Sequence, residues 1–195
     1  MGFSQEDESE KPEAAWENPV LVIVRGIKYN ESYKMLTGGI CMGSYLNPGN
    51  KGFQESLNSK IYVDKTGLIE KTNAALNTRQ KFMCVSRPRR FGKSMAADML
   101  AAYYARGEDS AELFKSLKIR KAESYEKHRN QYDVIKVNMQ EFLSRSHNVE
   151  ELIDRVKKLV IRDLKMEYPE VDYFDDTDLI ECMPVSYTHL TLPTN

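Results

Sequence analysis

The sequence predicts an α/β fold in which a parallel sheet is flanked by helices. Two short apolar segments, Phe82–Val85 and Tyr132–Val137, have the length and composition of buried strands. A helical stretch follows the first of them, with Met95, Met99 and Tyr103 spaced to share one face. A strand, a helical crossover and a second strand form the arrangement that places parallel strands in one sheet.

The loop between the first strand and its helix has the order of a phosphate-binding P-loop. Gly92-Lys93-Ser94 stands where the helix begins, and the N–H groups and positive dipole end of a helix start stabilise an anion. We expect Lys93 to contact the outer phosphates of ATP and Ser94 to give Mg²⁺ a hydroxyl ligand. The predicted nucleotide-binding residues are Arg87, Arg89, Arg90, Phe91, Gly92, Lys93, Ser94 and Met95.

One position departs from the usual P-loop pattern. The pattern has a glycine where this chain has Arg87, and Pro88 after it has no N–H to offer a phosphate. Three interpretations therefore stay open: nucleotide binding, contact of Arg87, Arg89 and Arg90 with a nucleic-acid backbone, or a structural relic that binds neither. Added salt should separate the first two, because backbone contacts weaken steeply with salt.

Before this loop the sequence predicts a short strand at Lys60–Val63 and a helix from Asp64 toward Leu76. Asp64 is either the N-cap of that helix, accepting hydrogen bonds from N–H groups one turn on, or part of the nucleotide site. After the P-loop helix, Arg106-Gly107 is the expected helix stop.

Two segments of the chain, Tyr62–Ile69 (YVDKTGLI) and Ser86–Met95 (SRPRRFGKSM), closely resemble the AAA-ATPase-like family of bacterial proteins. The resemblance runs from about Gly43 to Phe142. In that family an arginine-rich loop replaces the first P-loop glycine, so the resemblance implies a P-loop NTPase-type fold with ATP and Mg²⁺ as ligands. It also implies a PD-(D/E)xK nuclease-like domain farther along, which would add nucleic acid as a partner.

ATP hydrolysis needs an acidic residue at the end of a later strand to help hold Mg²⁺. The second strand of the family tends to end in such a residue, where this chain has Asn138. Leu159–Asp163 approximates an acid-ended strand, but it lies in a helical pattern that opens with a capping box of Asn148 and Glu151. The core-facing stripe predicted for this helix is Val149, Leu152, Ile153, Val156, Leu159 and Val160. We therefore expect the domain to be truncated before its acidic (Walker B) strand, and the chain to bind nucleotide weakly without hydrolysing it.

Composition argues against several classes of partner. The net charge of −1 creates no general field that recruits nucleic acid or an anionic membrane. The apolar run Val20–Val24 is too short to span a bilayer. Three widely spaced cysteines indicate a reducing, cytoplasmic compartment, with Cys84 expected to be a buried thiol in the first strand.

The sequence divides into three parts. Residues 42–184 form the partial P-loop domain. Residues 1–41 are expected to be a non-native or disordered extension, with at most a short extra strand at Val20–Val24. Gly38-Gly39 fits translation of a ribosome-binding site just before Met42. Residues 185–195 contain VSYTHLTLPT, which resembles the translation of a sequencing adapter, and we expect them not to be natural protein.

Overall fold

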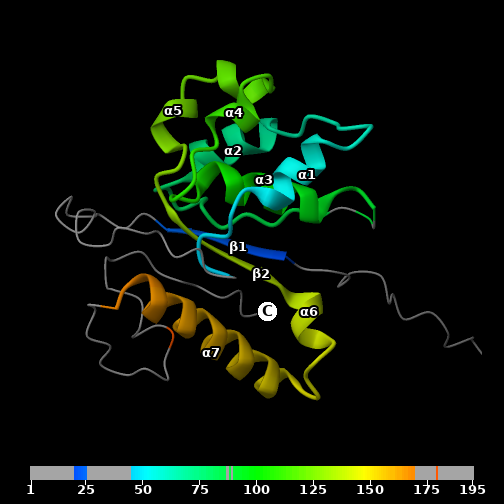
Figure 1. Cartoon of the computed structure of the whole chain (residues 1–195), viewed down its shortest axis with the longest axis vertical. Coiled ribbons are helices and arrows are strands. Elements are labelled where there is room, and N and C mark those ends of the chain that lie inside the picture. Colours follow the sequence, from blue (N-terminus) through cyan, green and yellow to red (C-terminus); the bar gives the residue numbers. More distant parts are fainter. Residues whose placement is uncertain (1–19, 26–44, 87, 89, 170–178, 180–195) are drawn as a thin grey trace, which may run out of the picture.

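The computed structural model describes residues 20–25, 45–86, 88, 90–169 and 179. The elements are, in chain order, β1 (Val20–Arg25), α1 (Lys51–Leu57), α2 (Gly67–Ala75), α3 (Lys93–Tyr104), α4 (Ala111–Phe114), η2 (Lys118–Lys121), α5 (Tyr125–His128), β2 (Asp133–Asn138), α6 (Met139–Leu143) and α7 (Val149–Glu167). Figure 1 shows the two strands between two layers of helices: α1 to α5 lie on one side and α7 lies on the other. The described part is therefore a mixed α/β structure.

β2 is the central strand of this arrangement. β1 pairs with it in antiparallel register, from Val20 opposite Asn138 to Arg25 opposite Asp133. The other edge of β2 pairs with residues 45–47, also antiparallel, through Leu46 opposite Ile135. Two backbone hydrogen bonds hold that edge, from Asn47 N–H to the Val134 carbonyl at 2.7 Å and from Lys136 N–H to the Tyr45 carbonyl at 2.8 Å.

The first predicted strand is not formed in this structure. Phe82–Val85 has no strand pairing, and Phe82, Met83 and Val85 are 58%, 43% and 47% exposed. A strand needs a partner edge, and both edges of β2 are already occupied. The described residues therefore contain no parallel sheet: β1 and residues 45–47 both pair antiparallel with β2, and the pairing of Ala105 with Tyr132 is an isolated parallel bridge. Cys84, which we expected to be buried, is an exposed free thiol.

The strand predicted at Lys60–Val63 is also absent from the described structure, where Ile61 is 80% and Val63 is 64% exposed. The second predicted strand is confirmed as β2, which begins one residue later than Tyr132. The apolar run at Val20–Val24 lies in β1, so that the short extra strand is observed there. The start at Met42 stays a prediction, and residues 1–19, 26–44 and 180–195 lie outside the described residues.

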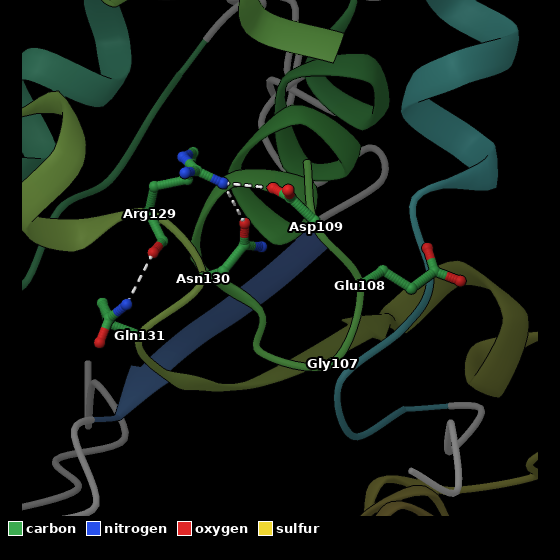
Figure 2. Close-up of a pocket in the computed structure, with 6 residues that line it drawn as sticks. All are labelled: Gly107, Glu108, Asp109, Arg129, Asn130 and Gln131. Carbon is green, nitrogen blue, oxygen red and sulfur yellow. Dashed lines mark hydrogen bonds and ion pairs between the residues drawn. The ribbon is translucent and has the colours of Figure 1, made fainter. Parts of the chain in front are cut away.

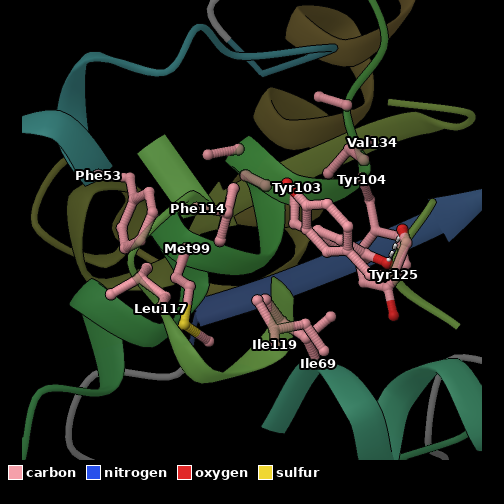
Figure 3. Packing of buried hydrophobic residues seen from close by; sticks show 13 residues of the cluster. Phe53, Ile69, Met99, Tyr103, Tyr104, Phe114, Leu117, Ile119, Tyr125 and Val134 are labelled. Atoms are coloured by element: carbon pink, nitrogen blue, oxygen red, sulfur yellow. Dashed lines mark hydrogen bonds between the residues drawn. The ribbon is translucent and has the colours of Figure 1, made fainter. Parts of the chain in front are cut away.

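Alternate residues of β2 point into two separate apolar cores, as expected for a strand with helices on both faces. Val134 is completely buried against α3, whereas Ile135 and Val137 are buried on the side of α7. Figure 3 shows the first core, in which Met99 lies among aromatic and aliphatic side chains that come from several helices. Its large members are Phe53, Ile69, Met99, Tyr103, Tyr104, Phe114, Leu117, Ile119 and Tyr125.

Two tyrosines at the C-terminal end of α3 fix this helix against α2. Tyr104 donates to Oδ1 of Asn73 at 2.6 Å, and Asn73 donates through Nδ2 to the Tyr103 hydroxyl at 3.0 Å. Burial raises the pKa of Tyr103 to about 12, so both its packing and its hydrogen bonds are those of the neutral phenol at neutral pH. The end of α3 is thereby rigidly placed, and with it the direction of the whole helix.

Arg106, which follows α3, joins all three layers. Its Nε donates to Asp133 of β2 at 2.5 Å, and Nη2 donates to Glu167 of α7 at 3.2 Å. The guanidinium also stacks over the ring of Tyr168, 5.3 Å from its centre. The helix stops slightly before the predicted Arg106-Gly107, because α3 ends at Tyr104 and its C-cap Ala105 is already extended. Gly107, with a φ of 117°, turns the chain two residues after the cap.

The helix predicted after Asn148 is confirmed as α7, with the Asn148 side chain accepting from the Glu151 N–H at 2.8 Å. The buried stripe differs from the predicted one. Val149 and Ile153 are 67% and 43% exposed, while Ile161 and Leu164 are buried together with Leu152 and Val160.

Candidate functional site

The N-terminal end of α3 lies at the Gly92-Lys93-Ser94 sequence. Gly92 is the N-cap, with φ 74° and ψ 36°, a left-handed conformation that a side chain disfavours. The helical ladder opens with a hydrogen bond from Ala96 N–H to the Gly92 carbonyl at 3.0 Å. The N–H groups of Ser94 and Met95 precede that bond, so they point out of the positive end of the helix.

The side chains of this end differ in exposure. Ser94 is exposed at the second helical position, whereas Lys93 and Met95 are half-buried. Phe91 is 60% exposed. Arg90 has a φ of 65°, which for an arginine costs on the order of 1 kcal/mol. Two left-handed residues, Arg90 and Gly92, therefore shape the turn that leads into α3.

Six of the eight predicted nucleotide-binding residues lie in the part of the chain that the structure describes. Arg90, Phe91, Gly92, Lys93, Ser94 and Met95 follow one another around the helix start, as their sequence order requires. Arg87 and Arg89 lie outside the described residues. Pro88 between them is exposed.

A lysine that we did not predict reaches this turn from another part of the chain. Lys65 precedes α2, and its Nζ donates to the carbonyl oxygen of Phe91 at 2.5 Å. A Cβ atom built on Gly92 would lie 2.5 Å from the same Nζ, so the ammonium sits directly beside the glycine. The signal in the sequence was the Asp-Lys-Thr stretch, from which we singled out Asp64 alone.

Asp64 anchors the turn that carries Lys65. Its Oδ1 accepts from the N–H of Thr66 at 2.8 Å and from the Thr66 hydroxyl at 2.6 Å, and Oδ2 accepts from the N–H of Lys118 at 2.9 Å. Burial by itself would raise the pKa of Asp64, but the hydrogen bonds from Thr66 and Lys118 outweigh it and lower the pKa below its usual value.

The role of Asp64 as helix N-cap is corrected by this geometry. α2 begins at Gly67 with Thr66 as its N-cap, so Asp64 accepts from an N–H two residues on rather than one turn on. Thr66 is completely buried, and its Oγ1 accepts from the N–H of Ile119 at 3.2 Å. Asp64 and Thr66 together tie this turn to η2, and both oxygens of the Asp64 carboxylate have partners in that role.

β2 runs antiparallel to α3 and ends near its start. Arg106, after α3, bonds to Tyr132 and Asp133 at the beginning of β2. Asp98, within α3, forms an ion pair with Lys136 farther along β2. The carboxyl end of β2 therefore points toward the N-terminal end of α3. Asn138, at this end, accepts from the N–H of Gln140 at 3.2 Å and acts as the N-cap of α6.

The shallow depression in Figure 2 is separate from this site. It is polar and follows the opposite end of α3, about 18 Å along a helix that rises ~1.5 Å per residue. Its polar groups bond to one another: Arg129 pairs with Asp109 and also donates to Asn130 at 3.1 Å. The remaining lining residues are Gly107, Glu108 and Gln131.

Two classes of feature are absent from the described part of the chain. Among the residues that the structure describes, no three histidine, cysteine or acidic side chains gather as they would around a metal ion. Within the same residues, no helix combines the length and apolar character needed to cross a membrane.

Comparison with known proteins identifies the family. No curated protein and no solved structure matches the chain. A family model described as a predicted AAA-ATPase matches residues 49–188, and thus covers the Lys65 turn, the Gly92-Lys93-Ser94 helix start and β2. The match extends past Phe142, where the resemblance in the sequence ends. The chain belongs to this AAA-ATPase-like family.

Proposed function

We propose that this chain binds a nucleoside triphosphate, together with Mg²⁺, at the N-terminal end of α3. One observation carries the proposal. Gly92 in a left-handed N-cap conformation opens a helix of 12 residues whose first two side chains are Lys93 and Ser94. This is the local geometry by which a P-loop presents N–H groups, an ammonium and a hydroxyl to phosphate and metal.

The residues present fit both ligands. Lys93 would contact the outer phosphates, and the N–H groups of the first helical turn would surround a phosphate oxygen. Ser94, exposed at the second position of the helix, would offer its hydroxyl to Mg²⁺. A Cβ at position 92 would lie 2.5 Å from Lys65 Nζ, so glycine is the residue that lets this ammonium approach the start of the helix.

The direction of β2 supports the same location. Ligands of open α/β sheets bind beyond the carboxyl ends of the strands, and the carboxyl end of β2 points toward Lys93 and Ser94. A P-loop fold with a parallel sheet is part of this proposal. It requires Phe82–Val85 to pair beside β2 in place of one of the two antiparallel neighbours.

Binding of a nucleic-acid backbone by the arginine-rich loop is the second candidate. The observation that favours it is an exposed aromatic ring, Phe91, next to an exposed arginine, Arg90. Arginines follow a phosphate backbone and aromatic rings stack on bases in proteins that bind single strands. Such binding should weaken steeply with salt and should not need Mg²⁺.

Equilibrium binding of a fluorescent, non-hydrolysable ATP analogue tests the proposal. Lys93→Ala should weaken binding about ten- to a hundred-fold, the loss of one charged hydrogen bond. Lys158→Ala, which removes an exposed lysine of α7 on the other side of the sheet, should bind like the wild type. A urea unfolding curve for each variant checks that the fold is retained.

The controls separate the candidates. Removal of Mg²⁺ by a chelator should weaken binding of the analogue to the wild type. Equal affinity of the wild type and Lys93→Ala would refute the proposed function. A labelled single-stranded oligonucleotide that binds at low salt, independently of Mg²⁺, would support the second candidate instead. Binding of neither ligand would leave the structural relic as the interpretation.

A further inference from the structure

Lys65 is held beside the proposed phosphate site by a rigid turn. Asp64 and Thr66, the residues on either side of it, bond to the backbone of Lys118 and Ile119 in η2. Thr66 is completely buried and Lys65 is half-buried. Because both neighbours are anchored, the side chain of Lys65 projects from a fixed backbone. The backbone therefore loses little further conformational entropy when the lysine binds a ligand.

The ammonium of Lys65 has donor capacity beyond the bond that it makes. Nζ donates to the Phe91 carbonyl at 2.5 Å, and an ammonium carries three donors. Nζ also lies 2.5 Å from the position that a Cβ of Gly92 would take, and thus beside the residue that opens α3. A phosphate bound at the first turn of that helix would lie close to the same ammonium.

The charge at this place favours an anion. Lys65 approaches the positive end of α3, next to the residue that precedes Lys93 and near Arg90 in the same turn. Cations gathered at the N-terminal end of a helix repel one another and the helix dipole. The Phe91 carbonyl, a neutral group, offsets this only in part. A polyphosphate would offset it with full negative charges.

We propose that Lys65 is a second lysine of the phosphate site, which contacts the phosphates beyond the first in a nucleoside triphosphate while it holds the Phe91 carbonyl. The inference rests on the proposed function and extends it to discrimination between triphosphates and monophosphates. The middle residue of the Asp-Lys-Thr turn thus acts on the ligand, and its two neighbours position it.

Binding of a non-hydrolysable ATP analogue and of AMP to the full chain, with Mg²⁺, tests this role. Lys65→Met keeps the length of the apolar stem and removes the charge. It should weaken binding of the ATP analogue about ten- to a hundred-fold and leave AMP binding within about twofold. Lys65→Arg should stay within a few-fold of the wild type. Lys71→Met, at an exposed lysine of α2, is the matched control and should change neither ligand.

Lys65→Gln separates contact with phosphate from support of the loop, because its amide can still donate to the Phe91 carbonyl but carries no charge. Loss of ATP-analogue binding like that of Lys65→Met supports the inference. Restored binding in Lys65→Gln, equal losses for the ATP analogue and AMP, or unchanged binding in Lys65→Met would each overturn it. If the wild type binds no nucleotide, the proposed function and this inference both fail. If the wild type binds the ATP analogue and Lys65→Met binds it equally well, the inference alone fails.

Discussion

Asp163 offers a sharp test of how the layers are joined. It lies in α7 and is 2% exposed. Its Oδ2 accepts from the backbone N–H groups of Tyr45 at 2.7 Å and Leu46 at 3.3 Å. Those residues belong to the segment 45–47, which pairs with the edge of β2 opposite β1. Asp163 therefore satisfies two donors of a chain segment that the sheet alone leaves unpaired on that side.

Replacement of Asp163 by alanine should lower the free energy of unfolding by about 3 kcal/mol. A buried N–H left without an acceptor costs about 1–3 kcal/mol, and the second donor, on the half-buried Tyr45, can be partly satisfied by water. The bond between Asp163 and Arg162 at 2.9 Å adds little, because the arginine is half exposed. Asp163→Asn keeps one carbonyl oxygen that can accept from both donors, so its loss should be about 1 kcal/mol.

Urea unfolding followed by circular dichroism measures these differences, provided that the slope with urea stays constant between variants. Asp154→Ala, at an exposed aspartate of the same helix, is the matched control and should change stability by less than about 0.5 kcal/mol. If Asp163→Ala is no less stable than Asp154→Ala, the two hydrogen bonds do not hold the edge segment. If Asn is as damaging as Ala, the role of the carbonyl acceptor is refuted.

The remaining predictions concern the site and the ion cluster after α3. Arg89→Ala or Arg90→Ala should weaken binding of an ATP analogue more than binding of AMP, because only a polyphosphate reaches along the loop; equal losses would assign these arginines a structural role. Burial raises the pKa of Glu167 above its usual 4.5, although the charge of Arg106 opposes this. The protonated carboxyl therefore stabilises the folded state fully below pH 4.5, and this stabilisation is lost as the pH rises through the raised pKa. Glu167→Gln should therefore flatten the fall in unfolding free energy above pH 4.5, and parallel pH curves for the two proteins would contradict this.

The sequence by itself determined the features that depend on near neighbours. Asn148 and Glu151 lie three residues apart, and they start α7 as predicted. Gly92 starts α3 in a positive-φ conformation, and Gly107 has a positive φ in the turn that follows the end of this helix at Tyr104. The strand at Tyr132–Val137 was also readable as a short, largely apolar segment, and it forms β2 one residue later.

Only the tertiary structure decided which segments meet. Phe82–Val85 has the composition of a strand, but a strand exists only with a partner, and β1 and residues 45–47 occupy both edges of β2. Lys65 contacts Phe91 across 26 residues, and Asp163 contacts Tyr45 across 118. Composition and periodicity describe residues within a few turns of one another, so they carry no information on such distant pairs. The helix start of the site was therefore readable in the sequence, whereas the second lysine beside it appeared only when the chain was folded.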